Sequence, residues 1–262
     1  MRCMKQASIH AGSKSIRAHA ERRVFYATSL MPDRPAACHS MQLFRSAKFV
    51  MSVAALADLP PPGLPEIAFA GRSNAGKSTA INLLTDQKRL AFASKTPGRT
   101  QLLNFFELSQ RDETVEGGKK SPLVPRAMLV DLPGYGFAQA PAAQRFAWDA
   151  LVGGYVAQRQ TLVGIVIVMD ARRPLMASDN AVIEFVSGRE SGLHLLLTKA
   201  DQLNNSEKKL ALMAAQQRAA QIGPRATAQL FSAPKRLGID ELSYILAGWL
   251  QMSPEKQATS QA

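Results

Sequence analysis

The octapeptide GRSNAGKS occupies residues 71–78 and directly follows the apolar run EIAFA. The spacing of its glycines and its Lys-Ser end match G-x-x-x-x-G-K-[ST], a pattern that binds nucleotide phosphates. Glycines at both positions permit a tight turn, after which backbone N–H groups at a helix start point toward phosphate oxygens. Lys77 would reach the β- and γ-phosphates, and Ser78 would ligate Mg²⁺. We therefore predict phosphate contacts from Gly71, Arg72, Ser73, Asn74, Ala75, Gly76, Lys77 and Ser78.

Three later segments decide which nucleotide is bound. DLPG (131–134) offers a carboxylate for the water shell of Mg²⁺ and a glycine N–H for a γ-phosphate. TKAD (198–201) matches [NT]-K-x-D, in which the aspartate accepts the two guanine donors N1 and N2 and the lysine lies along the base. In FSA (231–233), a backbone N–H of Ser232 or Ala233 can meet the guanine O6. The predicted contacts are Asp131, Leu132, Pro133, Gly134, Thr198, Lys199, Ala200, Asp201, Phe231, Ser232 and Ala233.

Each of these short motifs is weak evidence when it stands alone, and their common placement gives them weight. All four follow apolar segments with the length and composition of β-strands. Ligands bind at the carboxyl ends of the strands in open α/β sheets, and parallel strands bring those ends to one edge. The order of the motifs therefore predicts a guanine-nucleotide site, with GTP or GDP as ligand.

A polar loop, SKTPGRTQ (94–101), lies between the first motif and DLPG. A threonine in such a loop can close onto Mg²⁺ when a γ-phosphate is present and leave after hydrolysis, which makes an order–disorder switch. We expect Thr100 to be a second ligand of Mg²⁺ beside Ser78, or else a solvated loop residue. The contacts predicted here are Gly98, Arg99, Thr100, Gln101 and Leu102.

The residue after DLPG is Tyr135, where Ras places a glutamine that orients the attacking water. A tyrosine cannot do this in the same way, so intrinsic hydrolysis should be slow or assisted. The amide of Asn74 can hold a monovalent cation such as K⁺ against the phosphates, or it can simply stabilise the turn. Lys77, Thr100 and Asn74 are therefore the candidate catalytic residues.

The composition favours a cytoplasmic protein with polyanionic partners. The 262 residues are 46% apolar and carry a formal net charge of +12, which suits nucleic acid or an acidic membrane surface. The two cysteines, Cys3 and Cys38, both precede the first motif, so no disulfide framework is expected. No apolar run approaches the roughly 20 residues that span a bilayer, so we expect no stable membrane insertion.

Four regions follow one another along the chain. Residues 1–40 are basic and lack a sustained pattern, which indicates a disordered arm or a mis-assigned start. Residues 41–65 form a lead-in, residues 66–252 a nucleotide-binding domain, and residues 253–262 a polar tail. Apolar strands alternate with helical patterns from residue 66 onward, while 109–126 reads as a long hairpin connection. This alternation predicts an α/β fold with a mostly parallel, six-stranded sheet and helices on both faces.

With GRSNAGKS, SKTPGRTQ, DLPGYG, LLTKAD and FSA, the chain resembles the EngB-type bacterial ribosome-biogenesis GTPases over roughly residues 41–250. The resemblance implies a three-layer, Ras-like P-loop GTPase domain that binds GTP and GDP with Mg²⁺. It also implies a role in assembly of the large ribosomal subunit, with its precursor as partner, and in normal formation of the division septum. The basic residues 1–40 and the loop 109–126 depart from the family pattern. We expect a monomer.

Two other functions remain open at this stage. A division or membrane-surface adaptor controlled by GTP would use the same basic surface without acting on RNA. A P-loop ATPase or small-molecule kinase would share GRSNAGKS, but TKAD argues against it.

Overall fold

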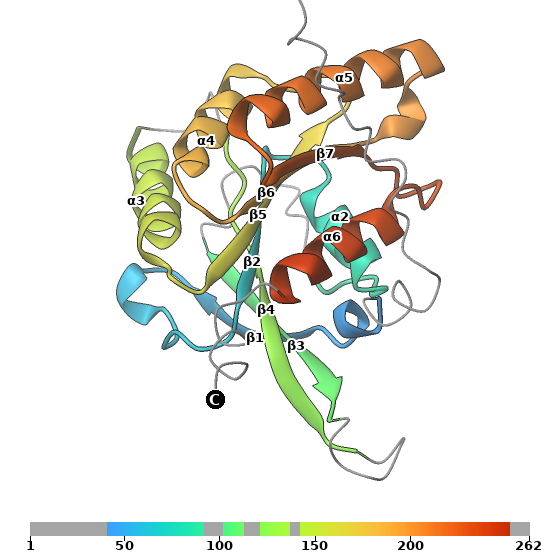
Figure 1. The fold of residues 1–262 in the computed structure, drawn as a ribbon. Coiled ribbons are helices and arrows are strands. Elements are labelled where there is room, and N and C mark those ends of the chain that lie inside the picture. The colour runs from blue at the N-terminus through green and yellow to red at the C-terminus, as the bar shows by residue number, and fades with distance from the viewer. Residues whose placement is uncertain (1–40, 92–101, 113–120, 137–141, 252–262) are drawn as a thin grey trace, which may run out of the picture. The chain divides into compact units, whose positions relative to one another are not determined.

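The computed structural model describes residues 41–91, 102–112, 121–136 and 142–251. All of them belong to the second of two compact units of the chain, Asp33–Ala262. Within this unit, one sheet carries the nucleotide-binding motifs (Figure 1). Among the residues described, no helix is long and apolar enough to cross a membrane.

The sheet has seven strands in the order β1-β3-β4-β2-β5-β6-β7 (Figure 1). Their bounds are β1 Lys48–Val53, β2 Glu66–Gly71, β3 Leu103–Arg111, β4 Leu123–Asp131, β5 Leu162–Asp170, β6 Gly192–Thr198 and β7 Ala226–Leu230. β2 pairs in parallel with β4 and β5, and β6 pairs in parallel with β5 and β7. Only β3 runs against its neighbours, β1 and β4. The predicted fold class, α/β with a mostly parallel sheet, is therefore confirmed.

The seventh strand comes from the stretch 41–65, which we expected to be only a lead-in. β1 pairs with β3 from Lys48↔Glu107 to Val53↔Leu103, with a bulge between Phe49 and Met51. Val53 is fully buried and Met51 packs against the same core. The sequence did not predict this strand because it is a largely exposed edge strand, and the bulge interrupts its apolar alternation.

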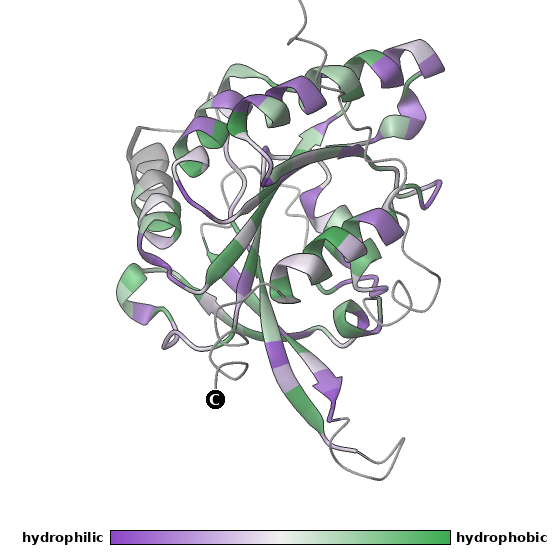
Figure 2. Ribbon diagram, in the orientation of Figure 1, coloured by the Kyte–Doolittle hydropathy of each residue, from purple (hydrophilic) through white to green (hydrophobic). Residues whose placement is uncertain are grey.

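The helices of eight or more residues in the described part of the chain cover the two faces of the sheet; they are α2 Lys77–Leu84, α3 Ala142–Gln158, α4 Ala177–Ser187, α5 Asn205–Ile222 and α6 Ile239–Gln251 (Figure 1). Side chains of α3, α4 and α5 pack with Ala68 and Ala70 of β2 in one core cluster. Side chains of α2 and α6 pack with Ile67 and Phe69 in the other. Successive residues of β2 thus face opposite layers, and all six are buried. Figure 2 shows apolar residues along these central strands and polar residues on the outer turns of α5.

The hairpin between β3 and β4 differs in length from the prediction. Strands were expected over 102–108 and 127–132, with 109–126 as their connection. Antiparallel pairing instead continues outward to Arg111↔Leu123, past a register shift at Ser109. The residues added to β3, Ser109–Arg111, are polar, and the Leu123 side chain added to β4 is 51% exposed. This part of the hairpin therefore shows no alternation of buried apolar and exposed polar residues that would predict a strand. Residues 113–120 of the predicted connection lie outside the described residues.

A buried carboxylate fixes the start of the central strand. Glu66 is 1% exposed and accepts hydrogen bonds from the Tyr155 hydroxyl at 2.6 Å, Arg159 Nε at 2.7 Å and Thr161 Oγ1 at 2.9 Å. A buried charge is tolerated when it is paired and hydrogen-bonded in this way. Because Glu66 begins β2, the network ties α3 to the strand that ends in the GRSNAGKS loop.

His194 makes the stability of the fold depend on pH. The side chain is fully buried on β6, its Nδ1 lies 2.7 Å from Thr227 Oγ1, and burial lowers its pKa to about 4, against a smaller opposing effect of Gln229. In the unfolded state, His194 therefore binds a proton below about pH 6.5, whereas in the folded state it binds one only below about pH 4. The stability that neutral His194 contributes is fully present above about pH 6.5 and is lost as the pH falls from 6.5 to 4. Between pH 7 and pH 5, the free energy of unfolding should fall by roughly 2 kcal/mol more than in His194→Gln.

Denaturant unfolding of both proteins at a series of pH values measures this difference. If the two stability curves run parallel from pH 7 to pH 5, His194 does not titrate on unfolding and the prediction is wrong.

Candidate functional site

The GRSNAGKS segment forms the loop between β2, which ends at Gly71, and α2, which begins at Lys77. Asn74 has φ 63° and Gly76 has φ 97°, so both adopt the left-handed conformation that a tight loop requires. A Cβ at Gly71 would lie 2.8 Å from the Val168 carbonyl oxygen of β5, which allows no side chain there. The two glycines therefore stand where backbone geometry and close packing demand them, and we refer to residues 71–78 as the P-loop.

DLPG lies against the P-loop at the end of β4. The ammonium group of Lys77 forms an ion pair with the carboxylate of Asp131, and both side chains are largely buried. A Cβ at Gly134 would lie 3.0 Å from Ser73 Oγ and 3.3 Å from the Ser73 backbone nitrogen. A side chain at Gly134 would crowd Ser73 where DLPG approaches the P-loop. The lysine and the carboxylate predicted to act on phosphates and Mg²⁺ lie together.

Backbone hydrogen bonds continue this contact past the end of the strand. The Leu132 N–H donates to the Phe69 carbonyl at 3.0 Å, and the Tyr135 N–H donates to the Gly71 carbonyl at 3.2 Å. The Ser73 N–H donates in turn to the Tyr135 carbonyl at 3.2 Å. The segment after β4 is therefore joined to the P-loop as a short extension of the sheet.

TKAD is also bonded to the P-loop. Thr198 Oγ1 donates to the carbonyl of Ala75 and lies 3.0 Å from the carbonyl oxygen of Met169. Lys199 Nζ donates to the Asn74 carbonyl at 2.6 Å, from a left-handed backbone conformation with φ 58°. These bonds place Lys199 beside the P-loop. A lysine that lies along a bound base would need this position.

Asp201 is oriented by the FSA segment, which begins one residue beyond the end of β7 at Leu230. Ser232 Oγ donates to Asp201 Oδ1 at 2.6 Å, and the Ala200 N–H donates to the Phe231 carbonyl at 3.1 Å. The Ser232 N–H donates to the Leu237 carbonyl at 3.1 Å. Because the Ser232 N–H already has an acceptor, the Ala233 N–H is the better candidate of the two predicted donors to a guanine O6.

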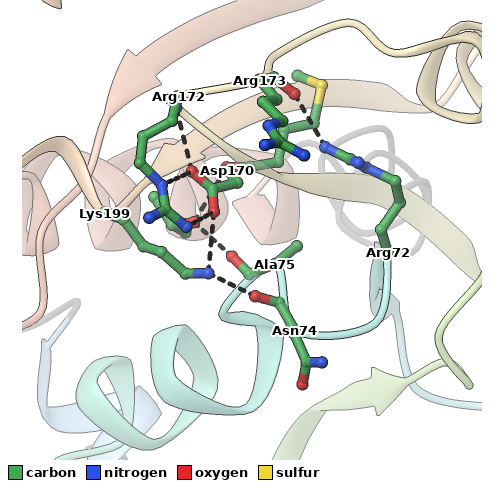
Figure 3. A network of polar contacts seen from close by, with 9 residues as sticks. Arg72, Asn74, Ala75, Asp170, Arg172, Arg173 and Lys199 are labelled. Carbon is green, nitrogen blue, oxygen red and sulfur yellow. Dashed lines mark hydrogen bonds and ion pairs between the residues drawn. The ribbon is translucent and has the colours of Figure 1, made fainter. Parts of the chain in front are cut away.

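A cavity of about 410 Å³ lies beside the P-loop, and three of its eight lining residues were not predicted. Residues 72–75 and Lys199 form one side, and Asp170, Arg172 and Arg173 form the other (Figure 3). Asp170 accepts from Arg172 Nη2 at 2.6 Å and from Lys199 Nζ at 2.9 Å. Burial alone would raise the pKa of Asp170, but these bonds hold it well below its ordinary range, so the carboxylate stays charged. The only sequence signal for it is the position of Asp170 at the end of the apolar run 162–169.

The predicted switch segment is not part of this geometry. Gly98, Arg99, Thr100 and Gln101 lie outside the described residues. Leu102, the last residue of that predicted set, is half-buried immediately before β3.

The donor set suits Mg²⁺ held mainly through nucleotide oxygens. Among the described residues, no group of three or more His, Cys, Asp or Glu side chains could hold a metal ion. Ser78, the second residue of α2, and Asp131 supply one hydroxyl and one carboxylate at the phosphate end of the site. Mg²⁺ in nucleotide sites keeps several waters and uses few protein ligands together with phosphate oxygens, so these residues fit it.

A parallel sheet whose edge carries a P-loop, DLPG and TKAD defines a P-loop GTPase, a class of GTP-hydrolysing enzymes. Residues 66–199 match the model of a family described as "50S ribosome-binding GTPase". The chain is 47% identical to the probable GTP-binding protein EngB of Ralstonia pickettii, over 85% of this chain and 94% of that protein. It is 48% identical to the protein of the same name in Paraburkholderia xenovorans, over 79% and 93% of the two chains. The chain therefore belongs to the EngB family of GTP-binding proteins, as its motifs predicted.

A solved structure of a probable GTP-binding protein engB shares the fold. It aligns with a TM-score of 0.51 at 20% identity, covering 72% of this chain and all of that one. The likeness supports the Ras-like arrangement of the sheet and helices.

The base preference should depend on Asp201. In Asp201→Asn, the side chain no longer presents two acceptors to the guanine N1 and N2 donors, whereas xanthine offers an acceptor to the new amide. We expect the affinity for GDP to fall by at least about tenfold, because hydrogen bonds to a charged group contribute roughly 1.5–3 kcal/mol. The affinity for xanthosine diphosphate should rise, and isothermal titration with both nucleotides measures the exchange.

Asp240→Asn, on the first turn of α6, is the matched control and should bind GDP like the wild type. An unchanged preference for GDP in Asp201→Asn would remove Asp201 from base recognition.

Proposed function

We propose that this chain is a GTP/GDP switch that acts on the large ribosomal subunit during its assembly. The observation that carries the proposal is the match of residues 66–199 to a family described as binding the 50S ribosome. The positive charge supports it, since the chain has a formal net charge of +12. Residues 1–40 hold seven lysines and arginines and two acidic residues, so residues 41–262 still carry +7. A net positive charge of this size favours contact with the phosphates of rRNA.

In this proposal, GTP and GDP occupy the site formed by the P-loop, DLPG, TKAD and FSA. Ser78 and Thr100 ligate Mg²⁺, and Asp131 holds its water shell. The contact of Thr100 requires the γ-phosphate, so hydrolysis releases the segment 98–102 and changes the surface that a partner meets. The protein acts as a cytoplasmic monomer, and its part in subunit assembly also supports normal formation of the division septum.

Intrinsic GTP hydrolysis is slow in this proposal because of the residue after DLPG. Tyr135 is 5% exposed and its hydroxyl donates to Asp179 at 3.0 Å, so it is committed to a carboxylate and not to a nucleophilic water. The positive charge that an arginine finger supplies in other GTPases comes here from a partner or from K⁺ held by the Asn74 amide. Asn74 is exposed on the P-loop, with its backbone carbonyl bonded to Lys199.

Sedimentation with purified 50S subunits tests the ribosomal function. The full chain should pellet with 50S subunits severalfold more in the presence of a non-hydrolysable GTP analogue than with GDP. Binding should fall by orders of magnitude between about 50 and 200 mM salt, because each phosphate contact releases counterions. Vesicles of anionic phospholipid form the second arm of the experiment.

Preferential pelleting with vesicles would replace this function with a membrane-surface adaptor. If binding to 50S subunits were equal with the GTP analogue and with GDP, the chain would be a ribosome-binding protein but not a switch.

The role of K⁺ has its own test. If the Asn74 amide oxygen holds K⁺ against the phosphates, the GTPase rate should be severalfold higher in KCl than in NaCl at equal ionic strength. Asn74→Ala should abolish that difference while retaining GDP binding. Asn205→Ala, on the first turn of α5, is the matched control and should respond to K⁺ like the wild type. Equal rates in the two salts for the wild type would exclude the cation.

A further inference from the structure

Asp179 links helix α4 to the nucleotide site through side chains that no motif includes. It lies in the first turn of α4 and is fully buried. Its Oδ1 accepts from Arg72 Nε of the P-loop at 3.0 Å and from the Tyr135 hydroxyl at 3.0 Å. Its Oδ2 accepts from the Met176 N–H at 3.0 Å. One carboxylate therefore joins three segments that are far apart in the sequence.

Capping of α4 explains only part of this arrangement. The bond to the Met176 N–H closes the start of the helix, as an acidic residue at the third position commonly does. An exposed carboxylate can do this without leaving water, whereas burying a charge costs several kcal/mol unless it is paired. Asp179 is fully buried against Arg72 and Tyr135. Capping of α4 does not require these two contacts, so it does not explain them.

Both partners belong to the phosphate end of the site. Arg72 is the second residue of the P-loop, and its Nη2 also donates to the Arg173 carbonyl at 2.9 Å (Figure 3). Tyr135 directly follows Gly134, and burial together with the charge of Asp179 raises the pKa of its phenol, which therefore stays protonated and donates. Asp179 thus holds the P-loop and the residue after DLPG from the same oxygen.

These contacts restrict the position of the Gly134 N–H. On one side, Gly134 packs against Ser73, where a Cβ would lie 3.0 Å from Oγ. On the other, Tyr135 is held through its backbone by Gly71 and Ser73 and through its hydroxyl by Asp179. A donor fixed before the ligand arrives pays less ordering entropy on binding than one on a loose segment.

We propose that Asp179 is a positioning residue that, through Tyr135, presets the Gly134 N–H for a γ-phosphate and so sets the affinity for GTP relative to that for GDP. The inference rests on the proposed nucleotide contacts of DLPG. GDP has no γ-phosphate, so its affinity does not depend on the link from Asp179 through Tyr135 to Gly134. A purely structural Asp179 would instead affect both nucleotides alike.

The test measures affinities for GDP and for a non-hydrolysable GTP analogue, with Mg²⁺, on the full chain. Tyr135→Phe removes only the hydroxyl that reaches Asp179, and should weaken the GTP analogue by about tenfold, as loss of one bond to a charged group implies. GDP affinity should stay within about twofold. Asp179→Ala also frees Arg72 of the P-loop, which affects both nucleotides, so its loss of affinity should be about tenfold larger for the GTP analogue than for GDP. Asp179→Asn, which keeps an acceptor oxygen, should restore part of that difference.

Ser187→Ala, which removes a hydroxyl from the far end of α4, is the matched control and should leave both affinities unchanged. Equal losses for the two nucleotides, a stronger affinity for the GTP analogue, or no change in Tyr135→Phe would each overturn the inference. If Asp179→Ala fails to fold, Tyr135→Phe decides alone. A wild type that binds GDP but not the GTP analogue would overturn the proposed switch itself, which keeps the two failures apart.

Discussion

Parallel pairing of β2 with β4 and β5 is the interaction on which the rest of the site depends. Its register places Phe69 beside Asp131 and Gly71 beside Val168, and the next pair of strands places Asp170 beside Thr198. Because these strands run in one direction, their carboxyl ends reach the same edge, and each motif follows the end of a strand there. A shift of one residue in any register would turn the apolar side chains of that strand to the wrong layer, so the core fixes the site.

Polar bonds between the loops hold them in conformations that the chain would otherwise avoid. Asn74 and Lys199 both have positive φ, which costs free energy for residues with a side chain. Lys199 bonds to the Asn74 carbonyl, and Thr198 bonds to the neighbouring Ala75 carbonyl. The P-loop and TKAD therefore support each other's strained geometry.

Carboxylates with little exposure lie near both ends of the central strands and serve different purposes. Glu66 starts β2 and is bonded to side chains of α3 and of the turn after it, so it secures the strand that carries the P-loop. Asp170 and Asp179 lie at the opposite end, and both are bonded to cationic residues of the cavity or the P-loop. The first stabilises the scaffold, whereas the other two hold cationic side chains beside the P-loop.

The sequence by itself determined the fold class, the order of the motifs and the residues of the P-loop, DLPG and TKAD, because strand periodicity and loop chemistry are local signals. It did not reveal β1, whose pairing energy comes from β3 some fifty residues later. Nor did it reveal Asp179, which resembles any acidic residue in the first turn of a helix. Only the tertiary structure brings that carboxylate to Arg72 and Tyr135, 107 and 44 residues away, because contacts between distant segments leave no periodic trace in a single sequence.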